Sequence, residues 1–177
     1  MLTNIKNQNS SRNIVMKTHT NDYKNIVKGL KTNKKINVIG PPGSGKTTLC
    51  EKISVDLQMN LIKLDDILFD KNCNLIQNKK EVLLKNLVTQ TPCVIDGTYH
   101  SLFCKDRIEL VDQFVMIEIN FFRTFLRIIK RTINKKKLAC GEKLTFNLIK
   151  FLCTYYLYKQ KSLKNIIPKN KLLIYKI

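Results

Sequence analysis

One stretch of the chain decides the fold: Gly40-Pro41-Pro42-Gly43-Ser44-Gly45-Lys46-Thr47. It matches the pattern G-x-x-x-x-G-K-[ST] in full. The glycines let the backbone curl so that successive N–H groups point inward and form a concave anion site. A helix that begins near Gly45 adds the positive end of its dipole to the same place. The stretch therefore predicts a loop that holds the phosphates of a nucleotide.

The side chains at the end of this loop suit a nucleotide bound with magnesium. We expect Lys46 to reach the β- and γ-phosphates, the hydroxyl of Thr47 to be a Mg²⁺ ligand, and Thr48 to bond the α-phosphate. The binding loop then runs from Gly40 to Thr48. The chain has no N-K-x-D segment, which would read guanine, and this favours ATP over GTP.

The sequence on either side of the loop predicts strands that alternate with helices. A short apolar run at 36–39 leads into the loop, and a helical pattern leaves it. Further strands are expected at 61–64, 93–95, 114–119 and 171–177, and helices at 81–88, 121–133 and 144–158. A short amphipathic helix before the loop has its apolar positions at 23, 26, 27 and 30, with Asn21 or Asp22 as its cap. This order is typical of an α/β fold with a parallel sheet and helices on both faces.

The composition bounds the class of protein. With 177 residues and 44% hydrophobic content, the chain is long enough for one domain with a sizeable core. Its six cysteines form no C-x-x-C pair, so we expect reduced thiols rather than disulfides or a zinc site. The start of the chain does not resemble a signal peptide, and no apolar run reaches the length of a membrane span. We therefore expect a cytoplasmic protein with no membrane partner.

The positive charge is unevenly distributed. The net charge of +19 divides into +7 over residues 1–35, −2 over residues 36–118 and +14 over residues 119–177. A general bias toward lysine would not produce this division. The basic last third suits an anionic partner such as phosphate or nucleic acid.

Asp96 is the natural acidic partner of the phosphate loop. It ends an apolar strand, where P-loop proteins place the carboxylate that holds Mg²⁺ through water. The alternative is an aspartate that only caps the next turn. Gly97 would let the chain turn sharply beside the phosphates.

Arg123, Arg127 and Arg131 are spaced by four residues and form one ridge on a helix. The chain has 27 Lys and only 5 Arg, so the choice of arginine here indicates that its bidentate geometry matters. Such arginines stabilise the charge that develops in phosphoryl transfer, and Arg127 and Arg131 are the stronger candidates. The alternative is a solvated basic face of a helix.

Two further groups of side chains leave alternatives open. Asp65 and Asp66 follow the second strand and could orient or deprotonate an acceptor hydroxyl, or could cap a loop. Three tyrosines in the basic last third could stack on bases, although the apolar face of a helix is favoured: Tyr155, Tyr156 and Tyr158.

From Ile36 onward, over about 80% of its length, the chain resembles the adenylate-kinase-like P-loop phosphotransferases. It is most similar to the DNA topology modulation proteins. Besides the loop, the likeness rests on Leu64-Asp65, Val94-Ile95-Asp96-Gly97-Thr98-Tyr99, Arg107, Val111-Asp112, Arg127, Arg131 and Cys140-Gly141-Glu142-Lys143-Leu144.

The resemblance implies a three-layer sandwich around a five-stranded parallel sheet of order 2-3-1-4-5. It also implies a lid, over about 121–145, that bears Arg127 and Arg131, and an acceptor site near Asp65, Tyr99 and Arg107. Residues 36–177 would form this domain. Residues 1–35 would be an N-terminal extension with a short helix, which the family usually lacks.

Two classes of function fit these features. The first is a kinase that moves the γ-phosphate of ATP, with Mg²⁺, to a small acceptor such as a nucleotide or nucleoside. The second is a nucleotide-dependent nucleic-acid-binding protein that grips the phosphate backbone with the basic last third. A kinase acting on nucleic-acid ends would join the two.

Overall fold

The computed structural model describes residues 19–20, 22–70, 76, 78–102, 105–133 and 146–177. The segment 140–144, on which the resemblance partly rests, and the last part of the expected lid region lie outside these ranges.

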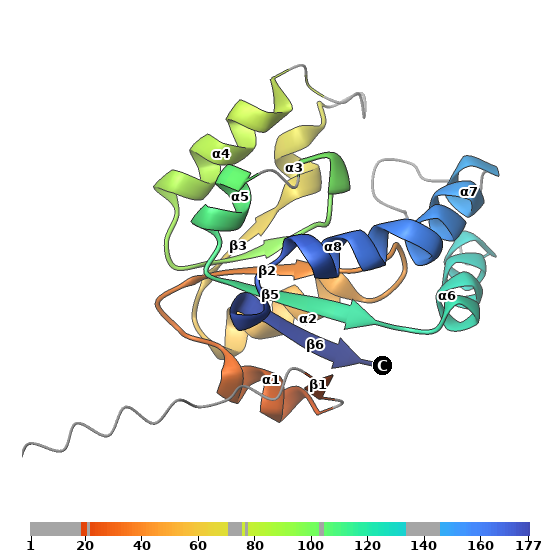
Figure 1. Ribbon diagram of the computed structural model, residues 1–177, viewed down its shortest axis with the longest axis horizontal. Helices are drawn as coiled ribbons and strands as arrows, with labels where there is room; N and C mark the ends of the chain where they lie inside the picture. The colour runs from red at the N-terminus through yellow and green to blue at the C-terminus, as the bar shows by residue number, and fades with distance from the viewer. Residues whose placement is uncertain (1–18, 21, 71–75, 77, 103–104, 134–145) are drawn as a thin grey trace, which may run out of the picture.

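The core of the fold is a sheet of six parallel strands in the order β1-β6-β5-β2-β4-β3 (Figure 1). The strands are β1 His19–Thr20, β2 Lys35–Ile39, β3 Asn60–Lys63, β4 Cys93–Asp96, β5 Gln113–Glu118 and β6 Leu172–Lys176. Strands β3-β4-β2-β5-β6 reproduce the expected order 2-3-1-4-5, so the predicted fold is confirmed. The sequence did not predict β1, which adds a short edge strand beside β6.

Helices connect the strands and cover the sheet. They are α1 Tyr23–Gly29, α2 Lys46–Asp56, α3 Leu64–Leu68, α4 Lys79–Thr89, α5 Lys105–Leu110, α6 Phe121–Ile133, α7 Phe146–Thr154 and α8 Gln160–Ile166. A π-helical turn at Tyr155–Lys159 joins α7 to α8, and 3₁₀ turns occur at His100–Leu102 and Lys169–Lys171. The helix expected at 144–158 corresponds to α7 and most of the π-helical turn, and α8 continues beyond the expected end. Asp65 and Asp66, expected directly after the second strand, lie in the first turn of α3.

Alternate side chains of the strands point to opposite faces of the sheet, as the pleat requires. In β5, Phe114 and Met116 pack in one core cluster with residues of α3, α4 and α8. Val115 and Ile117 pack in the other with residues of α1 and α2. A third cluster joins α6 to α7, and Figure 1 shows these two helices side by side beyond the carboxyl end of β5.

The segment before the phosphate loop is built into the second core cluster. Asp22 caps α1 by accepting a hydrogen bond from the backbone N–H of Lys24, at 3.0 Å, as predicted for this position. Ile26 is 1% exposed and Leu30 is 8% exposed, and both pack with Leu173 of β6. This burial fixes the position of α1 against the sheet.

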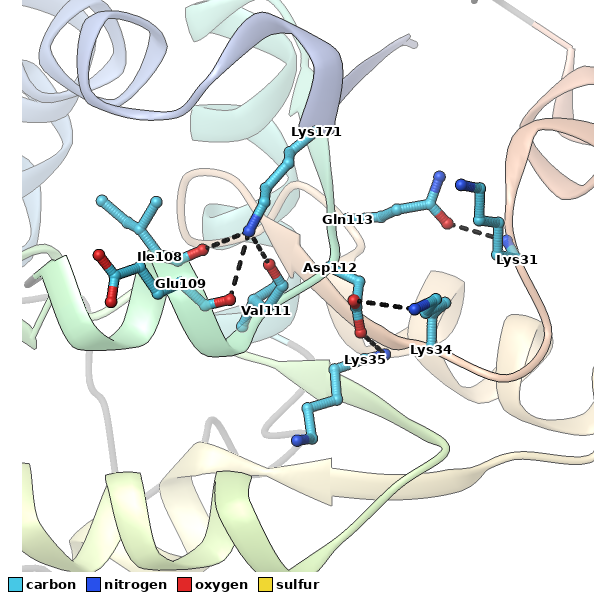
Figure 2. Close-up of polar contacts among 9 residues, drawn as sticks. All are labelled: Lys31, Lys34, Lys35, Ile108, Glu109, Val111, Asp112, Gln113 and Lys171. Carbon is cyan, nitrogen blue, oxygen red and sulfur yellow. Dashed lines mark hydrogen bonds and ion pairs between the residues drawn. The ribbon is translucent and has the colours of Figure 1, made fainter. Parts of the chain in front are cut away.

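Polar contacts join residues at the amino ends of the strands, on the opposite side of the sheet from the phosphate loop (Figure 2). Asp112 accepts a hydrogen bond from the backbone N–H of Lys35 at 2.9 Å and pairs with the ammonium group of Lys34 at 3.4 Å. Gln113 accepts a hydrogen bond from the backbone N–H of Lys31 at 2.8 Å. These contacts tie the start of β5 to the segment that leads into β2.

Lys171 holds the end of α5 in the same region (Figure 2). Its ammonium group donates to the backbone carbonyls of Ile108 at 2.9 Å, Glu109 at 3.3 Å and Val111 at 2.9 Å. The last carbonyls of a helix lack partners within the helix, and a cation there also interacts favourably with its dipole.

We expect Lys171→Met to lower the free energy of unfolding by about 1–3 kcal/mol, because the apolar stem is kept while the carbonyls lose a charged donor. Urea denaturation of the purified variant measures the effect. Lys169→Met, at an exposed lysine of the same turn, is the matched control and is expected to change the free energy by less than about 0.5 kcal/mol. Equal effects of the two substitutions would contradict the capping role.

Candidate functional site

The phosphate loop connects the carboxyl end of β2 to the first turn of α2. Gly43 and Gly45 have φ values of 74° and 92°, in the left-handed region where glycine is favoured. Gly43 is also close to α6, since a Cβ built on it would lie 3.0 Å from Cγ1 of Ile128. The loop therefore curls as the motif predicts, and α6 packs directly over it.

Thr98 holds the start of this loop. Its hydroxyl accepts a hydrogen bond from the backbone N–H of Gly40 at 3.0 Å and donates to the carbonyl oxygen of the same residue at 2.8 Å. Thr98 was not among the residues predicted to act in the site. In the sequence it was marked only by its place in the segment 94–99 that supports the resemblance; its contact with Gly40 follows from the pairing of β4 with β2.

Thr47 and Asp96, the two predicted magnesium ligands, lie side by side at the carboxyl edge of the sheet. The Thr47 hydroxyl donates to Oδ2 of Asp96 at 2.6 Å. Asp96 is only 9% exposed, and burial raises its pKa, against the opposing effects of the Thr47 hydrogen bond and the nearby Lys46 ammonium group. A hydroxyl and a carboxylate side by side are the hard oxygen ligands that Mg²⁺ prefers, so these two residues fit a magnesium ion.

Lys46 and Ser44 also fit a bound phosphate. The ammonium group of Lys46 reaches back across the loop and donates to the carbonyl oxygen of Pro41 at 2.9 Å. Ser44 is fully buried, and within the described residues its hydroxyl has no hydrogen-bond partner. A buried hydroxyl without a partner is costly, and an anion held in the loop would supply an acceptor.

The three arginines of α6 differ in their positions. Arg127 donates from Nη1 to the carbonyl oxygen of Ser44 at 3.3 Å, so it lies directly at the phosphate loop. Arg127 and Arg131 line a pocket of about 630 Å³ beside the loop. Arg123 is exposed and does not line this pocket. The predicted ridge therefore contributes two arginines to the site.

The pocket lies between the phosphate loop with its helix α2 on one side and α1, α6 and the end of β6 on the others. Its lining residues are Tyr23 of α1, Gly43, Ser44, Gly45, Thr48, Leu49 and Lys52 of the loop and α2, Arg127, Lys130 and Arg131 of α6, and Tyr175 and Ile177 at the end of β6. Cationic groups from α2 and α6 face this space, and its volume lies in the range of small-molecule sites.

Asp65 and Tyr99 lie close together on the same edge of the sheet. The Tyr99 hydroxyl donates a hydrogen bond to Oδ1 of Asp65. Tyr99 has a φ of 40°, an uncommon value for a residue with a side chain and one that is enriched at functional sites. Asp65 is half-buried, whereas Asp66 is exposed. Of the two predicted carboxylates, Asp65 is the one fixed in place.

Arg107 lies behind the loop rather than on the surface of the site, because its side chain is fully buried. Its guanidinium donates to the carbonyl oxygens of Thr98 at 3.0 Å and Gly97 at 3.1 Å, and to Oδ1 of Asn37 at 2.7 Å. Asn37 in turn donates from Nδ2 to the carbonyl oxygen of Ile95 at 2.9 Å. These contacts support the turn that carries Thr98 and Tyr99.

The tyrosines of the last third belong mainly to the helix packing, which was the favoured alternative. Tyr155 is 1% exposed, and burial raises its pKa. The Tyr156 hydroxyl donates to the carbonyl oxygen of Ile119 at 2.9 Å and lies 2.7 Å from the Thr124 hydroxyl. Tyr158 is 70% exposed.

Comparison with known proteins identifies the fold. The chain is similar in structure to a shikimate kinase from Acinetobacter baumannii in complex with shikimate (TM-score 0.56, 17% identity, 85% of this chain and 86% of that chain). A shikimate kinase from Bacteroides thetaiotaomicron has a TM-score of 0.53 at 17% identity, with coverage of 81% and 86%. A gluconokinase from Sinorhizobium meliloti 1021 has a TM-score of 0.53 at 16% identity, with coverage of 84% and 85%.

The sequence comparisons match a smaller part of the chain than the structural comparisons do. The model of a family described as Novel STAND NTPase 3 matches residues 18–86, which include α1, the phosphate loop and α2. No curated protein sequence is significantly similar to the chain. In the described part of the chain, no helix has both the length and the apolar character needed to cross a membrane. The likeness to solved structures shows a P-loop kinase fold; the resemblance to the DNA topology modulation proteins stays a prediction.

Proposed function

We propose that the chain is a kinase that binds ATP with Mg²⁺ and transfers the γ-phosphate to a hydroxyl group of a small acceptor. The observation that carries this proposal is the convergence of three groups on one edge of the sheet. These are the phosphate loop with Lys46, the Thr47–Asp96 pair, and Arg127 donating to the loop from α6.

Each group would have a separate task. The loop N–H groups and Lys46 would hold the phosphates, while Thr47 directly and Asp96 through water would hold the metal ion. Bound Mg²⁺ would neutralise charge on the phosphates. Arg127 and Arg131 would stabilise the charge spread over the oxygens of the transferred group, and α6 over the loop would help to exclude water.

Asp65 is the proposed base for the acceptor. Its carboxylate is oriented by the Tyr99 hydroxyl and lies on the edge of the sheet that carries the phosphate loop. In the reaction, the acceptor oxygen would form a bond to the γ-phosphorus, and the bond between the γ-phosphorus and the bridging oxygen would break, so that ADP leaves. The proton of the acceptor hydroxyl would pass to Asp65. Arg107 would act indirectly, by holding the turn that bears Tyr99. A nucleotide or nucleoside is the acceptor class that we propose to test first.

The test is incubation with ATP labelled in the γ-phosphate and Mg²⁺, beside a Lys46→Ala control. Separate reactions contain nucleosides, nucleoside monophosphates, shikimate, gluconate, or short DNA and RNA. A labelled product that is lost in the control is the expected result and names the acceptor class. If ATP binds without transfer of label, and DNA affinity changes with nucleotide, the nucleic-acid-binding alternative replaces the kinase.

We expect Arg127→Ala to lower the rate of phosphoryl transfer by about 10²-fold or more, since a charge-stabilising donor is lost. ATP affinity is expected to fall much less, because the guanidinium acts mainly on charge that develops during transfer. Single-turnover rates and equilibrium binding measure the two effects. Arg123→Ala, one turn earlier on the exposed face of α6, is the matched control. A loss confined to binding would contradict this role.

A further inference from the structure

The pocket beside the phosphate loop has a wall that comes from outside the loop and its helix. Tyr23 belongs to α1, which precedes the loop in the chain, and Tyr175 belongs to the last strand. These two residues also pack against the same core cluster. Helix α1, which lies in the expected N-terminal extension, therefore reaches the pocket beside the phosphate loop.

The position of Tyr23 is fixed by contacts with α2. Its hydroxyl donates to Oδ2 of Asp56 at 2.5 Å. The ammonium group of Lys52 lies over its ring, 3.8 Å from the ring centroid. Because α2 begins at the phosphate loop, these contacts hold the Tyr23 ring at a set distance from the loop.

The burial of α1 strengthens this placement. Ile26 and Leu30 anchor the helix in the core, and β1 before it pairs with β6 in register Thr20–Tyr175. The Tyr23 ring is therefore held from two sides, by its own helix in the core and by the end of α2. A side chain ordered in advance contributes to binding without a large loss of conformational entropy.

The chemistry of this wall differs from that of the loop. The loop presents N–H groups and Lys46, which suit phosphates, whereas the wall presents aromatic rings together with the Lys52 cation. Aromatic rings and cations favour contact with the flat face of a base. A pocket of about 630 Å³ that joins the two surfaces suits a ligand with a phosphate part and an aromatic part.

We propose that Tyr23 is a base-binding residue, and that α1 completes the nucleotide site by placing this ring against the nucleoside part of the nucleotide. The inference rests on the proposed function only in that the phosphate loop holds a nucleoside triphosphate. The Tyr23 ring, with the Lys52 ammonium group over it, and Tyr175 at the end of β6 line this side of the pocket.

The experiment compares ATP with inorganic tripolyphosphate, which has the phosphates and no base. Calorimetric affinities for both are measured with Mg²⁺ on the full chain and on Tyr23→Ala, Tyr23→Leu and Tyr23→Phe. We expect Tyr23→Ala and Tyr23→Leu to weaken ATP binding about 10-fold, the scale of one stacked base. Tripolyphosphate affinity is expected to stay within about twofold. Tyr23→Phe should keep most of the ATP affinity, because it keeps the ring and loses only the hydrogen bond to Asp56.

The ratio of the two affinities separates base binding from a structural role. Loosening of α1 would weaken both ligands or neither, and thermal melting of each variant reports it directly. An unchanged ratio in Tyr23→Ala and Tyr23→Leu would overturn the inference and leave the kinase proposal intact. Conversely, a wild-type protein that prefers ATP through Tyr23 and transfers no phosphate would overturn the kinase and leave the base-binding residue in place.

Discussion

Lys46→Ala is expected to lower phosphoryl transfer by about 10³-fold, which is the upper range for loss of one charge-stabilising donor. Lys46 is the first residue of α2, and its ammonium group already lies across the loop, at the Pro41 carbonyl. With alanine there, the phosphates keep the loop N–H groups and the helix dipole and lose the mobile positive charge. Binding of ATP should weaken as well, because the same cation contacts the ground state.

The fold should survive this substitution. Lys46 contributes nothing to the three core clusters, and alanine is a good helix former at the start of α2. Circular dichroism and urea denaturation check the fold, and single-turnover transfer of labelled phosphate checks the activity. Lys85→Ala, at an exposed lysine of α4, is the matched control. An unchanged transfer rate in Lys46→Ala would remove the loop from the active site.

The parts of the structure that could be predicted are those encoded in contiguous sequence. The phosphate loop is a single run of residues, and its glycines adopt the positive φ values that the motif requires. The helix at 121–133 has the predicted bounds. Its buried positions, Thr124 and Ile128, are four residues apart; the Ile128 side chain lies against Gly43 of the loop, and the Thr124 hydroxyl bonds to Tyr156.

The parts that could not be predicted depend on residues distant in sequence. Thr98 bonds to Gly40 only because β4 pairs with β2, and sequence spacing carries no sign of that contact. Tyr23 has the spacing of an apolar helix position, and its ring does pack against the core. Nothing in the neighbouring sequence indicated that the same ring also lines the pocket. For Arg107, the resemblance predicted a place near the acceptor, whereas its side chain is fully buried and bonds to the turn behind Tyr99, a distinction that depends on residues distant in sequence.

Arg107→Met is expected to lower the free energy of unfolding by about 3 kcal/mol or more. Methionine fills most of the volume, but the carbonyl oxygen of Thr98 and Oδ1 of Asn37 lose their donor, and the carbonyl oxygen of Gly97 keeps only the hydrogen bond from Nδ2 of Asn37. Each buried acceptor left without a partner costs about 1–3 kcal/mol. Urea denaturation measures the loss, and Lys105→Met, at an exposed cation of the same helix, is expected to change the free energy by less than about 0.5 kcal/mol.

The opposite outcome is physically reasonable and decides the role of Arg107. Replacing a buried charge with an apolar side chain can stabilise a protein when its hydrogen bonds do not offset the cost of desolvation. If Arg107→Met keeps or raises the free energy of unfolding while phosphoryl transfer falls, the role of the guanidinium is to position the turn that it bonds to, and not to stabilise the fold. That turn carries Thr98, which bonds to Gly40 at the start of the phosphate loop, and Tyr99, which bonds to Asp65, the proposed base. A variant with wild-type stability and wild-type transfer would contradict both roles.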